Sequence, residues 1–272
     1  MGLTRDSCHL FLVLILVPSV CYSQDAFVSS RATYYGSPEC LGTPSKQYLL
    51  STVIFFKHCV SILTREYQSA GACGYKEYGS IMNGGEVTAV SYKLFKDGAG
   101  CGACYQVRCK YPPHCNEDGT RVVATDHGEG DNTDFILSTR AYNKLALPGQ
   151  AEILISYGVV DVEYKRIPCQ YPGYNLVFNV HEHSNYPKYL ALIAIYQGGV
   201  SEITGVELWQ EDCKEWRCMR RAYGAVWDMQ NPPEGAIDLR FQVSGSKWIQ
   251  LKSLIPSDWK VGAIYNTAVQ LD

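Results

Sequence analysis

The uneven distribution of cysteine divides this chain into two regions. Eight of the 12 cysteines lie between residues 40 and 169, among dense glycines and turn sequences, whereas only Cys213 and Cys218 come later. The boundary falls near residues 169–173, where the sequence Cys-Gln-Tyr-Pro-Gly interrupts the pattern. A chain of 272 residues is long for one ordinary domain. We therefore expect two domains, at residues 24–170 and 174–269, and the hydrophobic content of 46% indicates globular cores.

The N-terminal residues 1–23 read as a secretion signal. Arg5 precedes a short apolar run at residues 9–17, and small residues at Cys21 and Ser23 fit cleavage after residue 23. The run is too short to span a bilayer, and no other stretch is a convincing span. We expect a mature protein that is secreted to the extracellular region or cell wall, without a membrane span. Ten cysteines remain after cleavage, and an oxidising exterior favours their pairing in disulfides.

Short strand-like runs dominate both regions. In the first region, residues 122–125 and 153–157 read as strands, and the only expected helix is residues 138–147, which begins with a Ser/Thr cap and stops before Pro-Gly. In the second region, alternating apolar residues at 237–243 predict a half-buried strand, and the apolar run 190–196 predicts a central one. Turn sequences between such runs favour an all-β protein whose second region is a β-sandwich.

Charge and ligand spacing argue against several classes of partner. The formal net charge of −3 makes nucleic acid an unsuitable partner. The cysteines at 101, 104 and 109 lack a second cysteine or histidine cluster at zinc-site spacing. His181 and His183 share one face of an expected strand without a third ligand, which favours a solvated face. We expect neither a metal nor another cofactor.

Several short sequences, in order, resemble known proteins. The first region resembles the N-terminal domain of expansins, through residues 32–36, 71–75, 100–109 and 123–126. The second region resembles the C-terminal domain shared by expansins and group-1 grass-pollen allergens, through residues 185–192, 222–227 and 255–260. Residues 128–131 and 211–216 point to the expansin-like B branch of plants. The order of the pieces and the paired domains make this resemblance specific.

The resemblance implies a six-stranded double-psi β-barrel followed by an immunoglobulin-like β-sandwich that acts as a carbohydrate-binding module. It also implies three disulfides, which are Cys73–Cys101, Cys104–Cys169 and Cys109–Cys115. Four further cysteines stay unassigned, namely Cys40, Cys59, Cys213 and Cys218, although the last two could close a small loop.

The acidic residues decide between hydrolysis and binding, because the expansin barrel is similar to that of inverting endoglucanases. Inversion needs two carboxyl groups about 6.5–9.5 Å apart, one to protonate the leaving oxygen and one to activate water. Asp126 matches one acidic position of the family, but Ile136 occupies the position of the second acid. Asp134 would have to act from about 6–7 Å further along the strand. We expect a protein that is not an enzyme; a weak endoglucanase using Asp126 and Asp134 is the alternative.

The residues expected to hold a polysaccharide fall in two sets. In the first domain the resemblance assigns a groove to Thr33, Tyr34, Tyr35 and Asp126, with barrel packing or turn closure as the competing roles. In the second domain pyranose faces are expected to stack on the exposed aromatic rings of Tyr189, Trp216 and Tyr223. The sequence does not decide whether Trp209 lies in the core or at the surface, and Trp227 and Trp248 are expected to fill the core.

These residues predict a monomeric, secreted cell-wall protein that binds cellulose, xylan or another β-glucan. The resemblance alone implies that the protein modulates wall extensibility, and the loss of the second acid argues against full wall-loosening activity. A barwin-like defence protein is a further alternative because such proteins share the barrel, but the second domain argues against it.

One segment, residues 46–69, departs from the resemblance. It contains the apolar run 48–56 and the odd Cys59 between glycine-rich turn sequences, and nothing in its pattern indicates which surface would cover it. We interpret it as translated intron or a faulty gene model, with a genuine long loop as the alternative. Sequencing of the transcript should give reads in which these codons are spliced out, whereas uniform inclusion would show a genuine loop.

Overall fold

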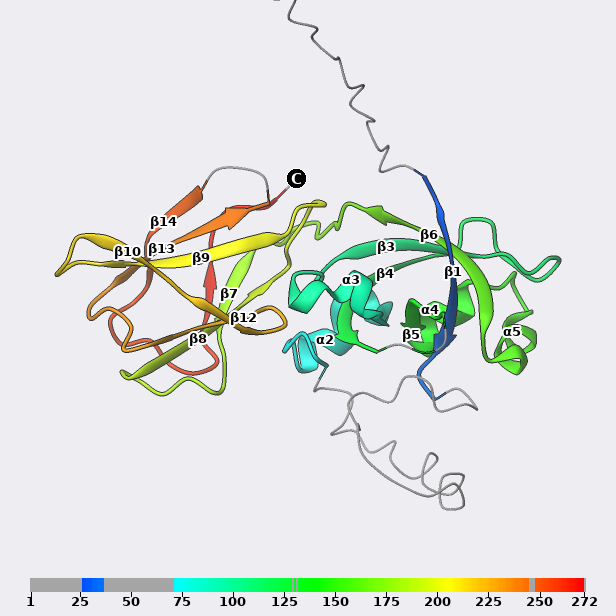
Figure 1. Ribbon diagram of the computed structural model, residues 1–272, viewed down its shortest axis with the longest axis horizontal. Coiled ribbons are helices and arrows are strands. Elements are labelled where there is room, and N and C mark those ends of the chain that lie inside the picture. Colours follow the sequence, from blue (N-terminus) through cyan, green and yellow to red (C-terminus); the bar gives the residue numbers. More distant parts are fainter. Residues whose placement is uncertain (1–25, 37–70, 129, 131, 245–247, 272) are drawn as a thin grey trace, which may run out of the picture.

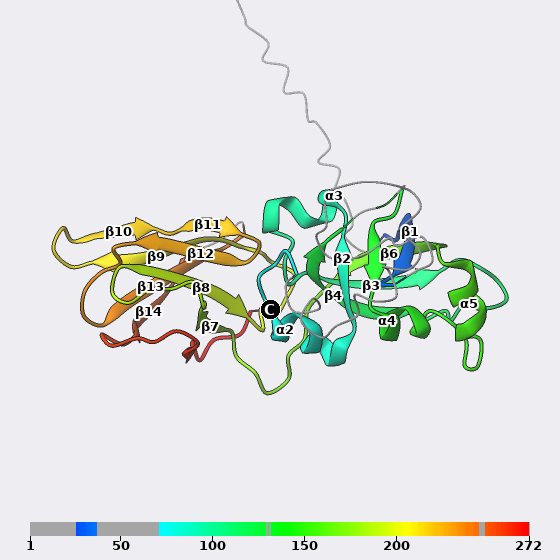
Figure 2. The same ribbon diagram turned by 90° about the horizontal axis from the view of Figure 1, so that it is seen from below.

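The computed structural model describes residues 26–36, 71–128, 130, 132–244 and 248–271. A barrel and a sandwich lie side by side along the long axis of the molecule (Figure 1). They stay side by side in the view turned by 90° (Figure 2), so the barrel packs against one end of the sandwich. The expected secretion signal and the segment 46–69 lie outside the described residues.

The first unit is a closed barrel of six strands in the order β1-β5-β2-β4-β3-β6. Its strands are β1 Val28–Tyr34, β2 Val87–Val90, β3 Cys104–Cys109, β4 Thr120–His127, β5 Phe135–Leu137 and β6 Val160–Ile167. The pairs β1–β5 and β2–β4 are parallel and the other four pairs are antiparallel. Side chains alternate across each strand, and the inward set, which includes Tyr105, Phe135 and Tyr164, fills the barrel.

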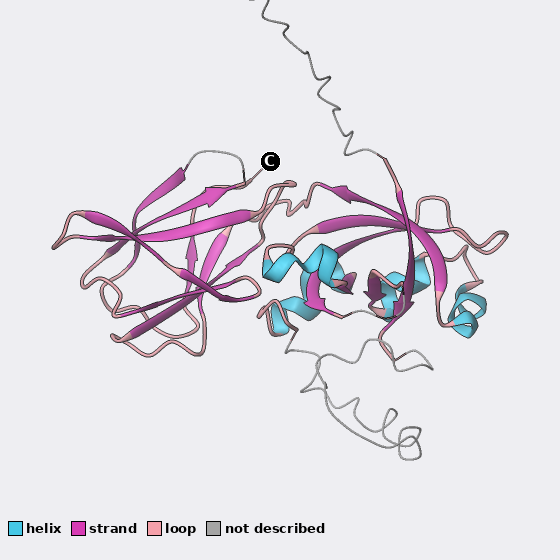
Figure 3. Cartoon of the chain, in the orientation of Figure 1, coloured by secondary structure: helices cyan, strands magenta, loops and turns pink. Residues whose placement is uncertain are grey.

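Helical segments occur only around the barrel within the described residues (Figure 3). They are α2 Glu77–Ile81, η1 Met82–Gly85, α3 Tyr92–Phe95, η2 Lys96–Gly98, α4 Thr139–Lys144 and α5 Ala151–Tyr157. The expected helix at 138–147 is shorter than predicted: the Ser138 hydroxyl accepts from the Ala141 N–H (3.2 Å), and α4 ends at Lys144.

The prediction of a strand at 153–157 is wrong, because these residues belong to the helix α5. Their burial is one-sided, with Leu154 fully buried and Ile153 39% exposed. Leu154 packs into the barrel core and its carbonyl accepts from the Tyr142 hydroxyl of α4 (3.0 Å). A short apolar run is compatible with either a strand or a helix, and the packing of α4 against α5 decides the outcome here.

The second unit is a sandwich of two antiparallel sheets, in the orders β10-β9-β13-β14 and β11-β12-β8-β7-β15. Its strands are β7 Val177–Val180, β8 Tyr189–Ile195, β9 Ile203–Gln210, β10 Glu215–Cys218, β11 Arg220–Tyr223, β12 Val226–Gln230, β13 Ile237–Val243, β14 Trp248–Ile255 and β15 Ile264–Asn266. The predicted alternation in β13 and the central place of β8 are confirmed. A barrel followed by two antiparallel sheets confirms the predicted all-β fold.

Among the residues that the structure describes, the disulfides are Cys73–Cys101, Cys104–Cys169 and Cys109–Cys115, the same pairs that the resemblance implies. Cys213 and Cys218 are exposed free thiols, with Cys213 in the turn before β10 and Cys218 at the end of that strand. The extended strand between them keeps the two sulfurs apart, so they do not close a loop. No helix in the described ranges is long and apolar enough to cross a membrane.

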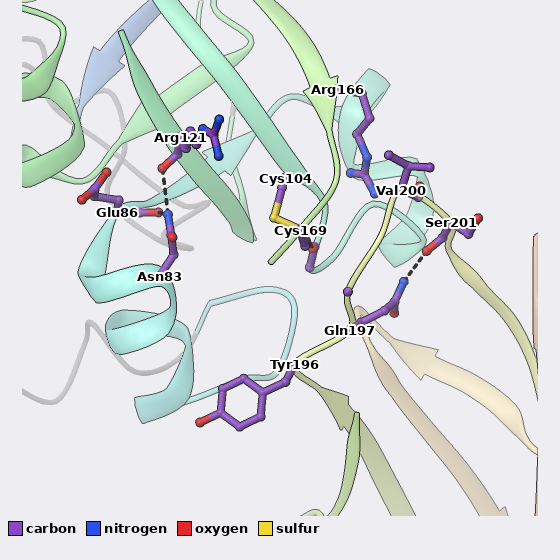
Figure 4. Close-up of a disulfide and its surroundings, with 12 residues drawn as sticks. Asn83, Glu86, Cys104, Arg121, Arg166, Cys169, Tyr196, Gln197, Val200 and Ser201 are labelled. Carbon is purple, nitrogen blue, oxygen red and sulfur yellow. Dashed lines mark hydrogen bonds between the residues drawn. A yellow bond between two sulfur atoms is a disulfide. The ribbon is translucent and has the colours of Figure 1, made fainter. Parts of the chain in front are cut away.

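A hydrophobic cluster joins the barrel to the sandwich. It combines Cys73 and Tyr75 beside the barrel with Ile193, Ile195 and Val226 of the five-stranded sheet. The disulfide Cys104–Cys169 lies next to this junction, where the Cys169 backbone pairs with Gly199 and the Arg166 guanidinium donates to the Val200 carbonyl at 3.2 Å (Figure 4).

The barrel and the sandwich approach each other closely at Gly224, in the turn between β11 and β12. The next residue, Ala225, donates its N–H to the Cys73 carbonyl (3.0 Å). A Cβ at Gly224 would lie 2.4 Å from the Ala72 carbonyl oxygen and 2.5 Å from the Cys73 Cα, and the backbone φ of +48° is in the left-handed region. Only glycine fits both conditions.

Replacement of Gly224 by alanine should therefore lower the free energy of unfolding by about 3 kcal/mol or more, because a left-handed alanine costs about 1–2 kcal/mol and the clash adds to it. Gly235→Ala is a matched control, since Gly235 has a φ of +81° and no atom within 4 Å of the added Cβ. Urea unfolding should show a loss of only about 1–2 kcal/mol for the control. Equal losses for both variants would contradict close packing at the junction.

Candidate functional site

One row of paired residues crosses the outer face of the barrel. Thr33 pairs with Ile136, Ile136 pairs with Ala89, and Ala89 pairs with Asp126, across the strands β1, β5, β2 and β4. Paired residues of neighbouring strands project to the same side of a sheet. These four side chains therefore share the outer face, while Tyr34 and its partner Leu137 point into the barrel core.

Asp126 is a fixed hydrogen-bond acceptor at one end of this row. Its Oδ1 accepts from the backbone N–H groups of Ala72 (2.6 Å) and His127 (2.8 Å), and its Oδ2 accepts from the Tyr35 hydroxyl (3.4 Å). The side chain is only 5% exposed, and this burial raises its pKa although the hydrogen bonds favour the carboxylate. Burial, with the Asp126 charge, also raises the pKa of Tyr35, so Tyr35 acts as a neutral donor.

Ile136 takes the place where a second carboxyl group would face Asp126. One strand, β2, separates the two residues, and two strand spacings place their Cα atoms about 10 Å apart. Ile136 is 1% exposed, and a Cβ at Gly128 would lie 2.9 Å from its Cδ1 atom. The Ile136 side chain therefore makes an aliphatic contact beneath the backbone at Gly128, and it has no proton to donate.

Asp134 lies just before β5 and is held as an acceptor. Its two carboxylate oxygens accept from the hydroxyls of Ser30 (2.7 Å) and Ser91 (2.6 Å). It borders a polar cleft of about 540 Å³, lined by Ser29, Ser30, Arg31, Ser91, Lys93, Gly130, Asn132, Thr133 and Asp134. Asp134 thus lies two residues before Ile136, and two hydroxyl donors already occupy its carboxylate oxygens.

Besides Asp126, two more of the groove residues named from the sequence are buried in the structure. Thr33 is fully buried and donates its hydroxyl to the Gly158 carbonyl (2.8 Å) at the end of α5. Tyr34 is 8% exposed, and its ring centroid lies 4.7 Å from that of Tyr142 inside the barrel. Both side chains hold helices to the barrel and have no surface for a ligand.

Tyr189 and Tyr223 lie on the five-stranded sheet of the sandwich, close to the junction. The Tyr189 hydroxyl donates to Asp228 Oδ2 (2.7 Å), and Arg220 donates two hydrogen bonds to the same carboxylate (3.0 and 2.6 Å). The Arg220 hydrogen bonds lower the pKa of Asp228, and burial together with Asp228 raises the pKa of Tyr189 to about 12. The Tyr189 ring is therefore fixed in place at the sheet surface.

Tyr223 is 41% exposed, and His181 orients its hydroxyl group. His181 Nδ1 accepts from the His183 N–H (3.3 Å), so the neutral imidazole carries its proton on Nε2. That Nε2–H group donates to the Tyr223 oxygen at 3.2 Å. The Tyr223 proton is then left to point away from His181, where it can donate to a ligand.

A second cleft joins these residues to the barrel. Its volume is about 340 Å³, and it is lined by Gly71, Gly74, Lys76, His181, Glu182, His183 and Tyr223. The loop 71–76 connects both parts of the site: Ala72 binds Asp126, and a Cβ at Gly74 would lie 3.1 Å from the Tyr223 ring. Lys76 forms an ion pair with Glu182 across the junction.

The prediction of a solvated histidine face is wrong for His181. β7 ends at Val180, and His181 begins a turn in which it is 3% exposed, while His183 stays exposed. The rings of the two histidines lie 4.7 Å apart. No group of three or more potential metal ligands occurs among the residues that the structure describes.

The tryptophans divide between the core and the other sheet. Trp227 is 5% exposed in the sandwich core, as predicted. Trp216 lies on β10 and pairs with Trp209 of β9, so both belong to the four-stranded sheet and not to the sheet of Tyr189 and Tyr223. Trp248 was expected in the core, but it is half-buried at the surface of the four-stranded sheet, where its ring lies over Gly205.

Sequence reasoning missed His181, Asp228 and Arg220 as supports of the two tyrosines. Asp228 is 4% exposed, and a buried acid inside the apolar strand β12 was the available signal for a partner. The partners themselves come from β8 and β11, and no spacing in the sequence identifies them.

Comparison with protein families matches both units. The profile described as Expansin C-terminal domain matches residues 176–256, and the profile described as Lytic transglycolase matches residues 87–164. Expansin-like B1 of Arabidopsis thaliana is 53% identical over 262 residues, which are 95% of this chain and 94% of that protein. Expansin-B3 of Oryza sativa subsp. japonica is 30% identical over 245 residues, with 89% and 82% covered.

The fold is also similar to that of a bacterial protein. The crystal structure of an apo expansin of Clavibacter michiganensis superposes with a TM-score of 0.62 at 18% identity, over 90% of this chain and 98% of that one. A mutant of the same expansin, crystallised in complex with cellohexaose, gives the same TM-score at 19% identity. At these identities the likeness concerns the fold alone.

The buried His181 predicts a pH-dependent loss of stability. Burial, then the charges of His183 and Lys76, lower its pKa from 6.5 to about 4. Because the unfolded chain binds this proton more readily, the free energy of unfolding should fall as the pH drops from about 6.5 towards 4. Thermal unfolding across this range should show a smaller loss in His181→Gln, while His183→Gln should retain most of the wild-type slope. Identical slopes in all three proteins would contradict the assignment.

Proposed function

Because the chain belongs to the expansin family, in its expansin-like branch, we propose that it is a secreted cell-wall protein that binds a polysaccharide chain across the junction of barrel and sandwich. The observation that carries this proposal is the loop 71–76. It is anchored to the barrel through the buried carboxylate of Asp126, and it lines the same cleft as the exposed ring of Tyr223.

The chemistry of this surface suits a glycan. Aromatic rings such as Tyr223 and Tyr189 stack on the apolar faces of pyranoses. Tyr223 is a donor for sugar hydroxyls, and the buried Asp126 fixes the loop that lines the cleft beside it. The cellohexaose bound by the bacterial expansin supports a β-linked glucan as ligand class. Cellulose and matrix glycans such as xylan are the candidates.

Binding without hydrolysis follows from the acidic residues. Cleavage of a glycosidic bond needs one group to protonate the leaving oxygen and a second group to assist attack. The raised pKa of Asp126 would suit an acid, but its oxygens accept three hydrogen bonds and Ile136 leaves it without a partner across the row. Asp134, two residues before Ile136, accepts from two serine hydroxyls. A catalytic group that is misplaced by about 1 Å can cost about a hundredfold in rate.

Secretion is supported by the covalent structure. Three disulfides stabilise the barrel and its approach to the sandwich, and such bonds persist in oxidising compartments outside the cytosol. The apolar run at residues 9–17 supplies the matching export signal.

Retention on insoluble cellulose and xylan tests this proposal. Tyr223→Ala should bind about threefold to tenfold more weakly than the unaltered protein, because one stacked ring is worth about 0.5–1.5 kcal/mol. Tyr223→Phe keeps the ring and should lose less. Tyr157→Ala is a matched control, since Tyr157 is 42% exposed but lies on α5, away from the junction.

Two results would contradict the proposal. One is a lack of retention of the unaltered protein on every wall polysaccharide. The other is release of reducing ends from soluble β-glucan that stops in Asp126→Ala, which would show a glycoside hydrolase.

A further inference from the structure

The outer face of the four-stranded sheet carries a group of aromatic residues that the junction site does not use. The residues Trp209, Trp216, Arg240 and Trp248 come from all four strands of that sheet, and we call them the Trp–Arg face. Each of the four side chains is half-buried. The opposite side of the same strands supplies Val206, Leu208 and Phe241 to the sandwich core.

One guanidinium group connects the rings of this face. The Cζ atom of Arg240 lies 4.5 Å from the ring centroid of Trp216 and 4.6 Å from that of Trp248. The carboxylate of Glu207 holds the guanidinium from the neighbouring strand, with an Nε–Oε2 distance of 2.6 Å. The Trp209 ring continues the row at 5.4 Å from Trp216. The rings are thus fixed beside one another before any ligand arrives.

The core does not account for these rings. Alternation along β13 sends Leu239 and Phe241 inward and Arg240 outward, and Trp248 pairs with the outward Gln242. Three half-buried indoles gathered on one sheet face differ from single hydrophobic residues scattered over a surface, and contiguous apolar groups of this kind mark binding surfaces.

The charges of this face indicate what it binds. The outward charged residues on its strands are Glu207, Asp238, Arg240 and Lys252, whose formal charges sum to zero, and Gln242 and Gln250 add neutral amides. In the adjoining turn, Glu211 accepts from the Trp209 indole and forms an ion pair with Lys214. Glu207 already neutralises Arg240, so neither an anionic polymer nor a phosphate surface finds an excess of positive charge. Flat rings bordered by amides and a fixed guanidinium complement an uncharged chain rich in hydroxyls.

We propose that the Trp–Arg face is a second polysaccharide-binding site, for a neutral β-linked glycan chain. The ligand class rests on the proposed function, but the site is separate from the junction. The two sheets enclose the core between them, so their outer faces point in opposite directions. One molecule therefore binds two glycan chains, one on each side of the sandwich, and holds them together.

Acrylamide quenching of tryptophan fluorescence reports chiefly on this face. The chain has five tryptophans, and two of them, Trp227 and Trp259, are 5% and 3% exposed in the core. The aromatic residues identified at the junction are tyrosines. Quenching by acrylamide therefore reaches chiefly the three indoles of the Trp–Arg face.

The first test titrates the unaltered protein with xylohexaose or cellohexaose in the presence of acrylamide. Bound oligosaccharide should lower the quenching constant at least about twofold, and the same protection should persist in Tyr189→Ala/Tyr223→Ala, which lacks the junction rings. Unchanged quenching at oligosaccharide concentrations that saturate binding would overturn the second site. Loss of protection in the tyrosine double variant would overturn its independence.

The second test measures bridging, as agglutination of cellulose or xylan particles. The unaltered protein should agglutinate them, whereas Trp216→Ala/Trp248→Ala should bind through the junction and fail to agglutinate. Trp216→Phe/Trp248→Phe keeps stacking rings and should still agglutinate, which separates ring loss from misfolding. Agglutination by the alanine variant at the wild-type level would overturn the proposal.

The outcomes also separate this inference from the proposed function. If binding is lost in the tyrosine double variant and unchanged in the tryptophan double variant, the junction site is supported and the Trp–Arg face is not a binding site. Absence of all binding would remove the proposed function itself. A sedimentation velocity experiment without glycan that shows a dimer, broken by Trp216→Ala, would make the face an interface between two copies and overturn the proposal.

Discussion

The position of the loop 71–76 between the barrel and the sandwich depends on the hydrogen bond from the Ala72 N–H to the Asp126 carboxylate. It attaches the loop 71–76 to the outer face of the barrel. The next residue, Cys73, is held by its disulfide to Cys101, and its carbonyl accepts from Ala225 of the sandwich. Because the loop lies between both units, the position of Tyr223 relative to Asp126 follows from these contacts. A rigid junction lowers the entropic cost of binding a long chain, since the two halves of the site need no reorientation.

The outer face of the barrel shows how a fold can keep a binding surface while it lacks the groups for hydrolysis. Asp126 and Ile136 occupy the two ends of a short row across β2, at a separation where a pair of carboxyl groups would be expected to work together. The isoleucine is not merely inert there. Gly128 covers its side chain, so the surface near Asp126 is closed over an apolar contact, and the remaining carboxylate acts as an anchor for backbone and hydroxyl donors.

The two sheets of the sandwich separate two sets of aromatic side chains, which the sequence alone does not distinguish. Tyr189 and Tyr223 belong to the five-stranded sheet and depend on Asp228 and His181 for their orientation. Trp209, Trp216 and Trp248 belong to the four-stranded sheet and gather around Arg240. In each set a buried or half-buried polar group fixes the rings, which reduces the side-chain entropy lost on binding.

Local patterns in the sequence were sufficient for the fold class and for the elements with strong periodicity. The alternation of β13, the central place of β8 and the capped start of α4 were predictable because each depends on neighbours along the chain. The resemblance to expansins supplied the order of the two units and the three cysteine pairs. The aliphatic residue at Ile136, and with it the expectation of binding without hydrolysis, was also visible from the sequence alone.

Only the tertiary structure decided which of the candidate side chains reach a surface and which surface they share. Tyr34 and Tyr35 are adjacent in sequence, yet strand alternation sends Tyr34 into the core and leaves Tyr35 to bind Asp126. The apolar run at 153–157 became a helix because α4 offers it a packing partner. Trp216 and Tyr223 are separated by seven positions but lie on opposite sheets. These outcomes depend on contacts between distant parts of the chain, and a single sequence carries no local signal for such contacts.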